Sequence, residues 1–287
     1  MLSPRDYAVW TMTGQNGLTP LYGRSLVEFA PVPDYEQQSR MTPDVARELP
    51  TRENGGLSAD GRTYTFHLRR GVRWNTSPAR DVTAGDFVRS FRIACNPVTP
   101  NWAWPYLRMV RGLPEYCQAF QKERPDVASI RRFVETNSIE GVRATNDSTL
   151  VVELVSPAAD FLPIVERVGA YPVEYLGLAI TEPDLVRRTI AAGPYQPVRY
   201  TPDREIIFAR NPAWDPAADP VRRAYVDSIR VTIGATTENG QQQMETGAAD
   251  LSLESPPSAA VASLMATNDP NLYFAPPGEI YAWHVGL

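Results

Sequence analysis

The feature that most constrains the fold is a change of hydrophobic period in the first third of the chain. Thr63–Leu68 consists mainly of β-branched and aromatic residues and follows a turn, which is typical of a strand. Val72–Trp74 predicts a short second strand after it. Phe87, Val88 and Phe91 then recur at helical spacing. Strand and helix therefore follow each other within one stretch, which indicates a mixed fold.

The start of that helix has its own signal. Thr83 is a suitable N-cap, and Asp86 lies where its side chain reaches back to the amide of the cap residue. These residues predict a helix over residues 84–94. A loop rich in proline and tryptophan, residues 97–105, is expected to follow it.

Elements of both kinds continue along the chain. The predicted strands are residues 139–144 and 149–154, joined by a turn at Asn146-Asp147, then 204–209, 228–233 and 250–253. The predicted helices are residues 159–168, 238–246 and 258–265, with another that carries Tyr116 and Phe120. Residues 193–195 are expected to open a loop. Strands and helices that interleave without a repeat predict a mixed α/β or α+β fold.

Composition and charge exclude several classes of protein. Hydrophobic residues make up 43% of the chain and charged residues 21%, which is normal for a globular protein. The net charge is −5, whereas a nucleic-acid binder normally has a basic face, so no nucleic-acid partner is expected. No apolar run reaches the roughly 18 residues that a membrane-spanning helix needs.

The usual catalytic and cofactor motifs are missing from the sequence. It has no glycine-rich dinucleotide or phosphate loop and no Gly-x-Ser-x-Gly elbow. The histidines, His67 and His284, have no second histidine at ligand spacing, and the two cysteines are too far apart for a zinc knuckle. We therefore expect no catalytic residue, no metal and no cofactor.

The two cysteines, Cys95 and Cys117, leave two interpretations open. They form one disulfide in an exported protein, or they are unrelated buried thiols. No basic stretch followed by an apolar run opens the chain, so these residues hold no signal peptide. Residues 280–287 have the pattern of a strand with no polar tail after it, and we expect both ends to be cut from a longer chain.

Five segments together resemble one family. They are residues 42–48, residues 58–74 continuing into 81–91, residues 147–157, residues 192–195 with 206–214, and residues 247–251. In this order they are similar to the extracellular solute-binding proteins of bacterial ABC importers, the oligopeptide- and dipeptide-binding family 5. One departure lies after Trp74, where Asn75–Arg80 replaces the family's Asp-Gly-Thr-Pro turn.

The resemblance implies a periplasmic-binding-protein-like α/β fold of the type II, peptide-binding class. This chain would be its first lobe, and the second lobe would be absent. Residues 1–28 plus 169–287 would form a discontinuous α/β core, and residues 29–168 an inserted α+β subdomain. The insert is long enough to bury a core of its own.

The resemblance also implies where a ligand would bind. In peptide-binding members an extended ligand pairs with main-chain groups as an added strand. The positions implied are Tyr7, Ala8, Val9 and Trp10, then Trp102, Ala103 and Trp104 in the proline-rich loop, and Tyr281 and Trp283 at the crossing to the second lobe. The alternative for Trp102 and Trp104 is internal packing. Trp74 and Tyr195 are expected to be structural.

The function implied is solute binding without catalysis. Peptide leads as the solute, and delivery would be to the membrane subunits of an ABC permease. The protein would be a monomer outside the cytoplasm, either a lipoprotein on the cell surface or periplasmic. A nickel chelate, an oligosaccharide or a sensory binding role are the alternatives, and a peptide or glycan hydrolase is the rival of another class. Family members with cysteines at this spacing also favour a bond between Cys95 and Cys117.

Overall fold

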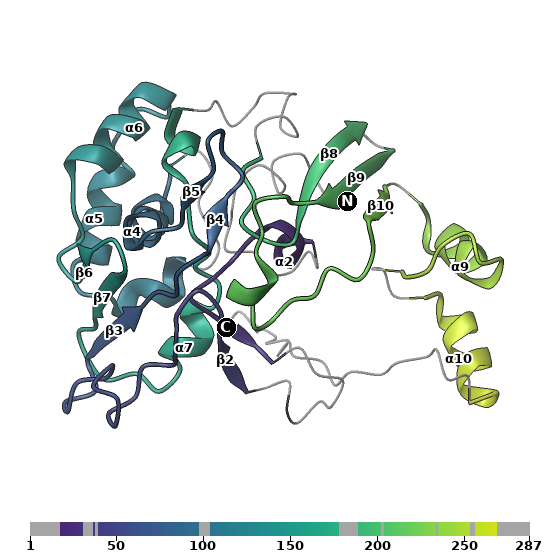
Figure 1. Ribbon diagram of the computed structural model, residues 1–287, viewed down its shortest axis with the longest axis horizontal. Helices are drawn as coiled ribbons and strands as arrows, with labels where there is room; N and C mark the ends of the chain where they lie inside the picture. The colour runs from purple at the N-terminus through teal and green to yellow at the C-terminus, as the bar shows by residue number, and fades with distance from the viewer. Residues whose placement is uncertain are drawn as a thin grey trace, which may run out of the picture. The chain divides into compact units, whose positions relative to one another are not determined.

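A computed structural model describes residues 18–30, 37, 40–97, 104–177, 189–201, 204–233, 235–252 and 256–268 (Figure 1). The chain divides into two compact units, residues 1–31 with 40–233 and residues 32–39 with 234–287. This division follows a different line from the one between core and insert, which both fall largely in the first unit. The boundaries of core and insert therefore remain a prediction.

The first unit contains a three-stranded antiparallel sheet. Its strand order is β3 (Thr63–His67), β7 (Thr149–Glu153) and β6 (Val142–Asn146). Phe66 lies opposite Leu150 in the register, and both side chains are fully buried. The strand predicted at 63–68 and the hairpin predicted at 139–154 are confirmed, with β6 beginning at Val142 rather than at residue 139.

Three helices lie in the same part of the unit as this sheet (Figure 1). They are α4 (Ala84–Ile93), α5 (Leu113–Phe120) and α6 (Val127–Thr136). α4 contacts β6, β7 and α6. The rings of Phe120 and Phe133 stack with centroids 4.6 Å apart, which joins α5 to α6. The predicted α4 and α5 are confirmed, whereas α6 was not predicted.

A reciprocal capping box begins α4, as the sequence predicts. Thr83 has extended backbone angles, and its amide donates to the Asp86 carboxylate at 3.0 Å. The helix ends at Ile93, one residue before the C-cap Ala94. Its buried face includes Phe87 and Phe91, both fully buried. The cap therefore fixes where the chain turns from the strand pair β4 (Arg73–Trp74) and β5 (Arg80–Asp81) into the core.

A second three-stranded antiparallel sheet has the order β10 (Ser228–Thr232), β9 (Glu205–Arg210) and β8 (Tyr195–Thr201). The alternation predicted for β10 is present, since Ile229 and Val231 are half-buried between exposed residues. The expectation of a loop at 193–195 is wrong at its last residue, because Tyr195 begins β8. The Gly-Pro dipeptide indicated a turn, but the residues that follow it form a strand because they pair with β9.

Several short elements complete the first unit. They are α2 (Thr19–Tyr22), the pair β1 (Val27–Phe29) and β2 (Met41–Pro43), the pair β4 (Arg73–Trp74) and β5 (Arg80–Asp81), α7 (Phe161–Val165), and the 3-10 turns η2 (Trp104–Met109), η3 (Val173–Gly177) and η4 (Pro216–Ala218). The predicted strand 72–74 and helix 159–168 correspond to β4 and α7. The β1–β2 pair was not predicted.

The described part of the second unit contains two helices, α9 (Thr237–Glu245) and α10 (Ser258–Ala266). Both were predicted, and Gly247 has the left-handed φ of 71° expected of a glycine after a helix. The strand predicted at 250–253 is not formed at residues 250–252, and residue 253 lies outside the described residues. No helix among the described residues is both long and apolar enough to cross a membrane.

Candidate functional site

The predicted ligand-contacting residues fall almost entirely outside the part of the chain that the structure describes. Those outside it are Tyr7, Ala8, Val9, Trp10, Trp102, Ala103, Tyr281 and Trp283. Trp104 is the first residue of η2, and its side chain is not described. What the structure does describe is how the chain is anchored on both sides of the loop that carries Trp102.

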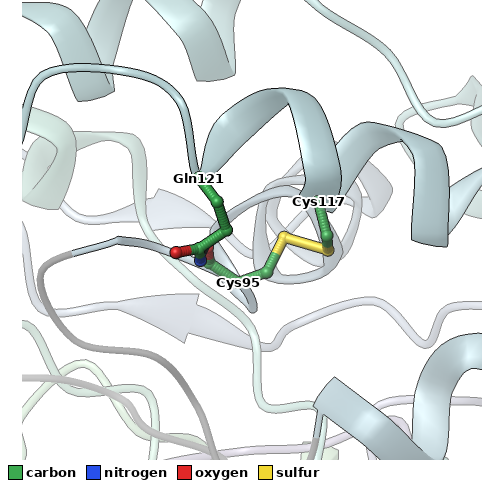
Figure 2. The surroundings of a disulfide bond; sticks show 3 residues. All are labelled: Cys95, Cys117 and Gln121. Atoms are coloured by element: carbon green, nitrogen blue, oxygen red, sulfur yellow. Dashed lines mark hydrogen bonds between the residues drawn. A yellow bond between two sulfur atoms is a disulfide. The ribbon is translucent and has the colours of Figure 1, made fainter.

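A disulfide anchors the first side of this loop. Cys95 directly follows the C-cap of α4, and Cys117 lies in α5. Their Sγ atoms are 2.09 Å apart and their Cα atoms 5.6 Å apart, so the predicted pairing is confirmed. Figure 2 shows the bond with Gln121, whose Nε2 donates to the carbonyl oxygen of Cys95 at 2.6 Å. The chain therefore enters the loop from a fixed point.

The end of the central strand β7 anchors the other side. Val110 forms an isolated β-bridge with Leu154, just past the end of β7. The amide of Arg111 donates to the carbonyl of Glu153 at 2.9 Å, and the amide of Val155 donates to the carbonyl of Met109 at 2.8 Å. Residues 98–103 thus connect two points that the described structure holds in place.

The chain that follows Tyr7–Trp10 is anchored at α2. The amides of Ala192 and Gly193 both donate to the carbonyl of Tyr22, each at 2.9 Å. The Tyr22 ring stacks on Phe208 of β9 with centroids 6.2 Å apart. A Cβ atom on Gly193 would lie 2.7 Å from the carbonyl oxygen of Leu21, so only glycine allows this close approach.

Charged side chains in the same unit as these anchors form a buried network. Arg24 pairs with Asp44 at 2.6 Å and with Asp219 at 3.1 Å, and all three side chains are at most 1% exposed. Arg222 pairs with Asp44 at 3.0 Å. Burial alone would raise the pKa of Asp44, but Arg222 and Arg24 outweigh it and hold the pKa below its usual value. The network holds together the segments next to β1, β2 and η4.

A second buried carboxylate, Asp86, organises the β4–β5 ribbon. Trp74 Nε1 donates to it at 3.0 Å, Arg80 Nη1 at 3.0 Å and Arg89 Nη1 at 2.8 Å. Trp74 is fully buried, as predicted for a core residue. Tyr195 is also structural, since it is buried and its hydroxyl donates to the carbonyl of Val226 at 2.9 Å. The contacts of these residues stabilise the packing of the fold.

No group of three or more histidine, cysteine, aspartate or glutamate side chains among the described residues is arranged to hold a metal ion. The described residues form anchors and buried ion pairs on either side of the segment 98–103. The sequence profile of the bacterial extracellular solute-binding proteins, family 5 (middle region), matches residues 40–285. The chain belongs to this family.

Two curated relatives illustrate how broad the family 5 match is. Heme-binding protein A of Haemophilus influenzae is 30% identical over 208 residues, which are 70% of this chain and 34% of the relative. The dipeptide-binding protein of Escherichia coli is 30% identical over 193 residues, which are 66% of this chain and 31% of the relative. The chain therefore spans about a third of the length of these relatives.

Solved structures of family members share the fold. The clavulanic acid biosynthesis oligopeptide binding protein 2 superposes with a TM-score of 0.70 at 26% identity, over 87% of this chain and 42% of its own. The unliganded open form of the murein tripeptide binding protein MppA has a TM-score of 0.70 at 18% identity, over 96% and 47% of the two chains. The predicted fold class is confirmed.

The buried charges of this family 5 chain were not predicted from its sequence. Arg24 gave the only usable signal, because it stands between Tyr22 and Leu26 in an otherwise apolar stretch, where an arginine needs a buried partner. Nothing in the sequence pointed from Arg24 to Asp219, which is far along the chain. Long-range pairs of this kind have no periodicity by which to find them.

Proposed function

We propose that the chain is part of an extracellular receptor that binds peptides and delivers them to an ABC permease, without catalysis. The observation that carries the proposal is the family 5 match over residues 40–285. Names of relatives support peptide as the solute, among them the dipeptide-binding protein of Escherichia coli and the oligopeptide-binding protein OppA of Bacillus subtilis. Membrane subunits of the permease would be its partners, and it would act as a monomer.

The contacts proposed are those implied by the resemblance. Residues 7–10 would pair with the main chain of an extended peptide, and Trp102 and Trp104 would offer broad apolar surfaces to its side chains. Tyr281 and Trp283 would line the same cleft. The disulfide at Cys95 supports this proposal, because a loop whose ends are already fixed loses less conformational entropy when a ligand orders it.

The arrangement of the lobe belongs to the same proposal. Residues 1–28 plus 169–287 would be the core and residues 29–168 the insert of one lobe. Part of the ligand site would come from outside this chain, since the chain covers less than half of its relatives. Closure of two lobes around the solute would be the working motion. The protein would be anchored as a lipoprotein or free in the periplasm.

The test is a binding and turnover measurement on the longest chain that the gene encodes. A mixture of dipeptides and oligopeptides is added, and bound species are identified by native mass spectrometry. The double variant Trp102→Ala/Trp104→Ala should bind at least about tenfold more weakly if the rings contact the peptide. Tyr225→Ala is the matched control, because this aromatic side chain is 86% exposed and should not affect binding.

Three results would contradict the proposal. Cleaved peptides would indicate a hydrolase, and unimpaired binding by the double variant would place both tryptophans in the interior. Binding of a nickel chelate or an oligosaccharide with no peptide would replace the solute. The mass of the bound or released species distinguishes the first and third outcomes, and the affinity of the double variant decides the second.

Heme is the second candidate solute. The observation that favours it is the 30% identity to heme-binding protein A of Haemophilus influenzae over 208 residues. Hemin added to the same protein, followed by its absorption spectrum after gel filtration, tests it. A stoichiometric hemin complex that peptides do not displace would favour heme over peptide.

A further inference from the structure

The two cysteines of the disulfide are among the most completely buried residues of the first unit. Cys95 is 0% exposed and Cys117 is 2% exposed. They lie on different elements, since Cys95 follows the C-cap of α4 and Cys117 lies within α5. A reagent in solution therefore reaches either residue only after a change in how these helices pack.

The helix that carries Cys117 is held in place by its own buried face. Leu113, Tyr116 and Phe120 of α5 are at most 5% exposed, and Cys117 belongs to the same face. The Phe120 ring stacks on Phe133 of α6 with centroids 4.6 Å apart, and the edge of the Tyr116 ring meets Phe133 at 5.1 Å. Moving α5 far enough to expose Cys117 would break these aromatic contacts.

Gln121 fixes the main chain at both cysteines. Its side-chain Nε2 donates to the carbonyl oxygen of Cys95 at 2.6 Å, and its main-chain amide donates to the carbonyl oxygen of Cys117 at 2.9 Å. Figure 2 shows the Gln121 side chain beside the bond. Because Gln121 is the C-cap of α5, this end of the helix cannot unwind without breaking its hydrogen bond to Cys95.

A disulfide is broken by thiol–disulfide exchange, which needs direct contact with a sulfur atom. A thiolate attacks one sulfur, and the other sulfur leaves as a thiolate. A dithiol such as dithiothreitol then closes on itself, so that it loses two electrons and two protons and both cysteines become thiols. Buried cysteines are inert because the attacking group has no access to them. Formation of the bond by a disulfide oxidant is the reverse of this reaction, so burial blocks it in the same way.

We propose that the bond between Cys95 and Cys117 is made and broken only while α5 is detached from α4. A reducing thiol then acts only on the fraction of molecules in which α5 has opened, and an oxidant completes the bond only before α5 packs. The redox state of the pair is set when the chain folds and is kept afterwards. The inference concerns the bond alone, so it stands apart from the proposed function.

The expected rate of reduction follows from this dependence on opening. When opening and closing are faster than exchange, the observed rate equals the rate in the unfolded chain multiplied by the open fraction. Opening α5 breaks the aromatic contacts with α6 and exposes apolar side chains, so the open fraction is small. The native chain should therefore be reduced at least about 100-fold more slowly than the unfolded chain.

The test measures how fast dithiothreitol reduces the bond in the 287-residue chain at about pH 8, where part of the reductant is thiolate. Samples are alkylated with iodoacetamide at intervals, and the free thiols are counted from the intact mass. The reaction is run in buffer and in urea that unfolds the chain, with oxidised glutathione in both to correct for the effect of urea on exchange. Equal corrected rates in the two conditions would overturn the proposal.

A variant identifies α5 as the part that must open. Phe120→Leu removes the ring that stacks on Phe133, so the open fraction and the reduction rate should rise by roughly fivefold or more. Phe29→Leu is the matched control, because the Phe29 side chain in β1 is 37% exposed, and its rate should equal that of the wild type. An unchanged rate in Phe120→Leu would overturn the proposal, since the reductant would then reach the sulfur without opening of α5.

Should Phe120→Leu not fold, the wild-type chain in low urea decides. Opening of a helix exposes surface, so the corrected reduction rate should rise steadily with urea below the unfolding midpoint. A rate that does not depend on urea in this range would overturn the proposal. None of these readouts involves a solute, so their failure leaves the proposed receptor function untouched.

Discussion

The buried carboxylate of Asp86 contacts several different parts of the first unit. It caps α4 through the amide of Thr83 and accepts from the indole of Trp74. It also neutralises Arg80 and Arg89, whose side chains are 30% and 20% exposed. Helix start, core tryptophan and the β4–β5 ribbon therefore depend on one side chain.

Replacing this carboxylate should destabilise the first unit. Asp86→Asn keeps the size of the side chain but removes its charge and one acceptor oxygen, so at least one buried donor loses its partner. We expect a loss of about 2–3 kcal/mol in the free energy of unfolding, measured by urea titration. Asp81→Asn is the control, because its side chain is 76% exposed and its one ion pair among the described residues is with Arg73 at 3.7 Å; it should change stability by less than about 0.5 kcal/mol. Equal effects would contradict this account of Asp86.

A second single-residue prediction concerns Gly193. Gly193→Ala places a methyl group 2.7 Å from the carbonyl oxygen of Leu21, and backbone must move to admit it. The free energy of unfolding should fall by about 1–3 kcal/mol, with a lower urea midpoint. Gly85→Ala in α4 is the comparison, since the nearest atom, Thr83 Oγ1, would be at an ordinary 3.5 Å. That variant should be neutral or stabilised by up to about 1 kcal/mol, and the reverse order would refute the steric explanation.

Elements with a regular hydrophobic period were predicted well. The β3 strand, α4 with its cap, and the β6–β7 hairpin follow from patterns that lie within one short stretch of sequence. β8 was missed because Gly193-Pro194 and Pro197 are strong turn signals, and only pairing with β9 overrides them. The pair β1–β2 was missed because three-residue strands are too short to show a period.

The helix α6 shows a different kind of failure. Asp126 caps it by accepting from the amide of Ser129 at 2.8 Å, and Ile130, Phe133 and Val134 form its buried face. Both signals were present in the sequence. They lie in the short segment between α5 and the β6–β7 hairpin. The predicted ligand-contacting residues fall almost entirely outside the described residues, so that part of the sequence reading stays a prediction.

The disulfide links the end of α4 to α5, so its removal tests how these two helices are held together. The cysteines are 22 residues apart. In the chain-entropy model a ring of this size stabilises by about 3 kcal/mol, and Cys95→Ala/Cys117→Ala should lose an amount of that order in urea unfolding. The intact protein, denatured without reductant, should show no free thiol in a titration. Two reactive thiols, or a double variant as stable as the parent, would contradict the prediction.

At the scale of the molecule, the chain covers less than half of the solved relatives that it matches. A ligand held between two lobes is contacted from both sides, and water is excluded by closure. We therefore expect this 287-residue chain by itself to bind peptides weakly or not detectably. Isothermal titration calorimetry with a peptide mixture measures this, and submicromolar binding would show that one lobe suffices. The longest chain that the gene encodes, titrated in parallel, is the positive control.

The spacing of Cys95 and Cys117 also bears on how such a protein matures. A chain secreted in an extended state reaches an oxidising compartment N-terminus first, and both thiols would emerge close together in time. The two cysteines of this chain allow one pairing with each other, and the structure shows that pairing. The disulfide would then close the segment that carries Trp102 before most of the residues that pack against it have been secreted. Recombinant protein made in a reducing cytosol would lack this disulfide until it is oxidised.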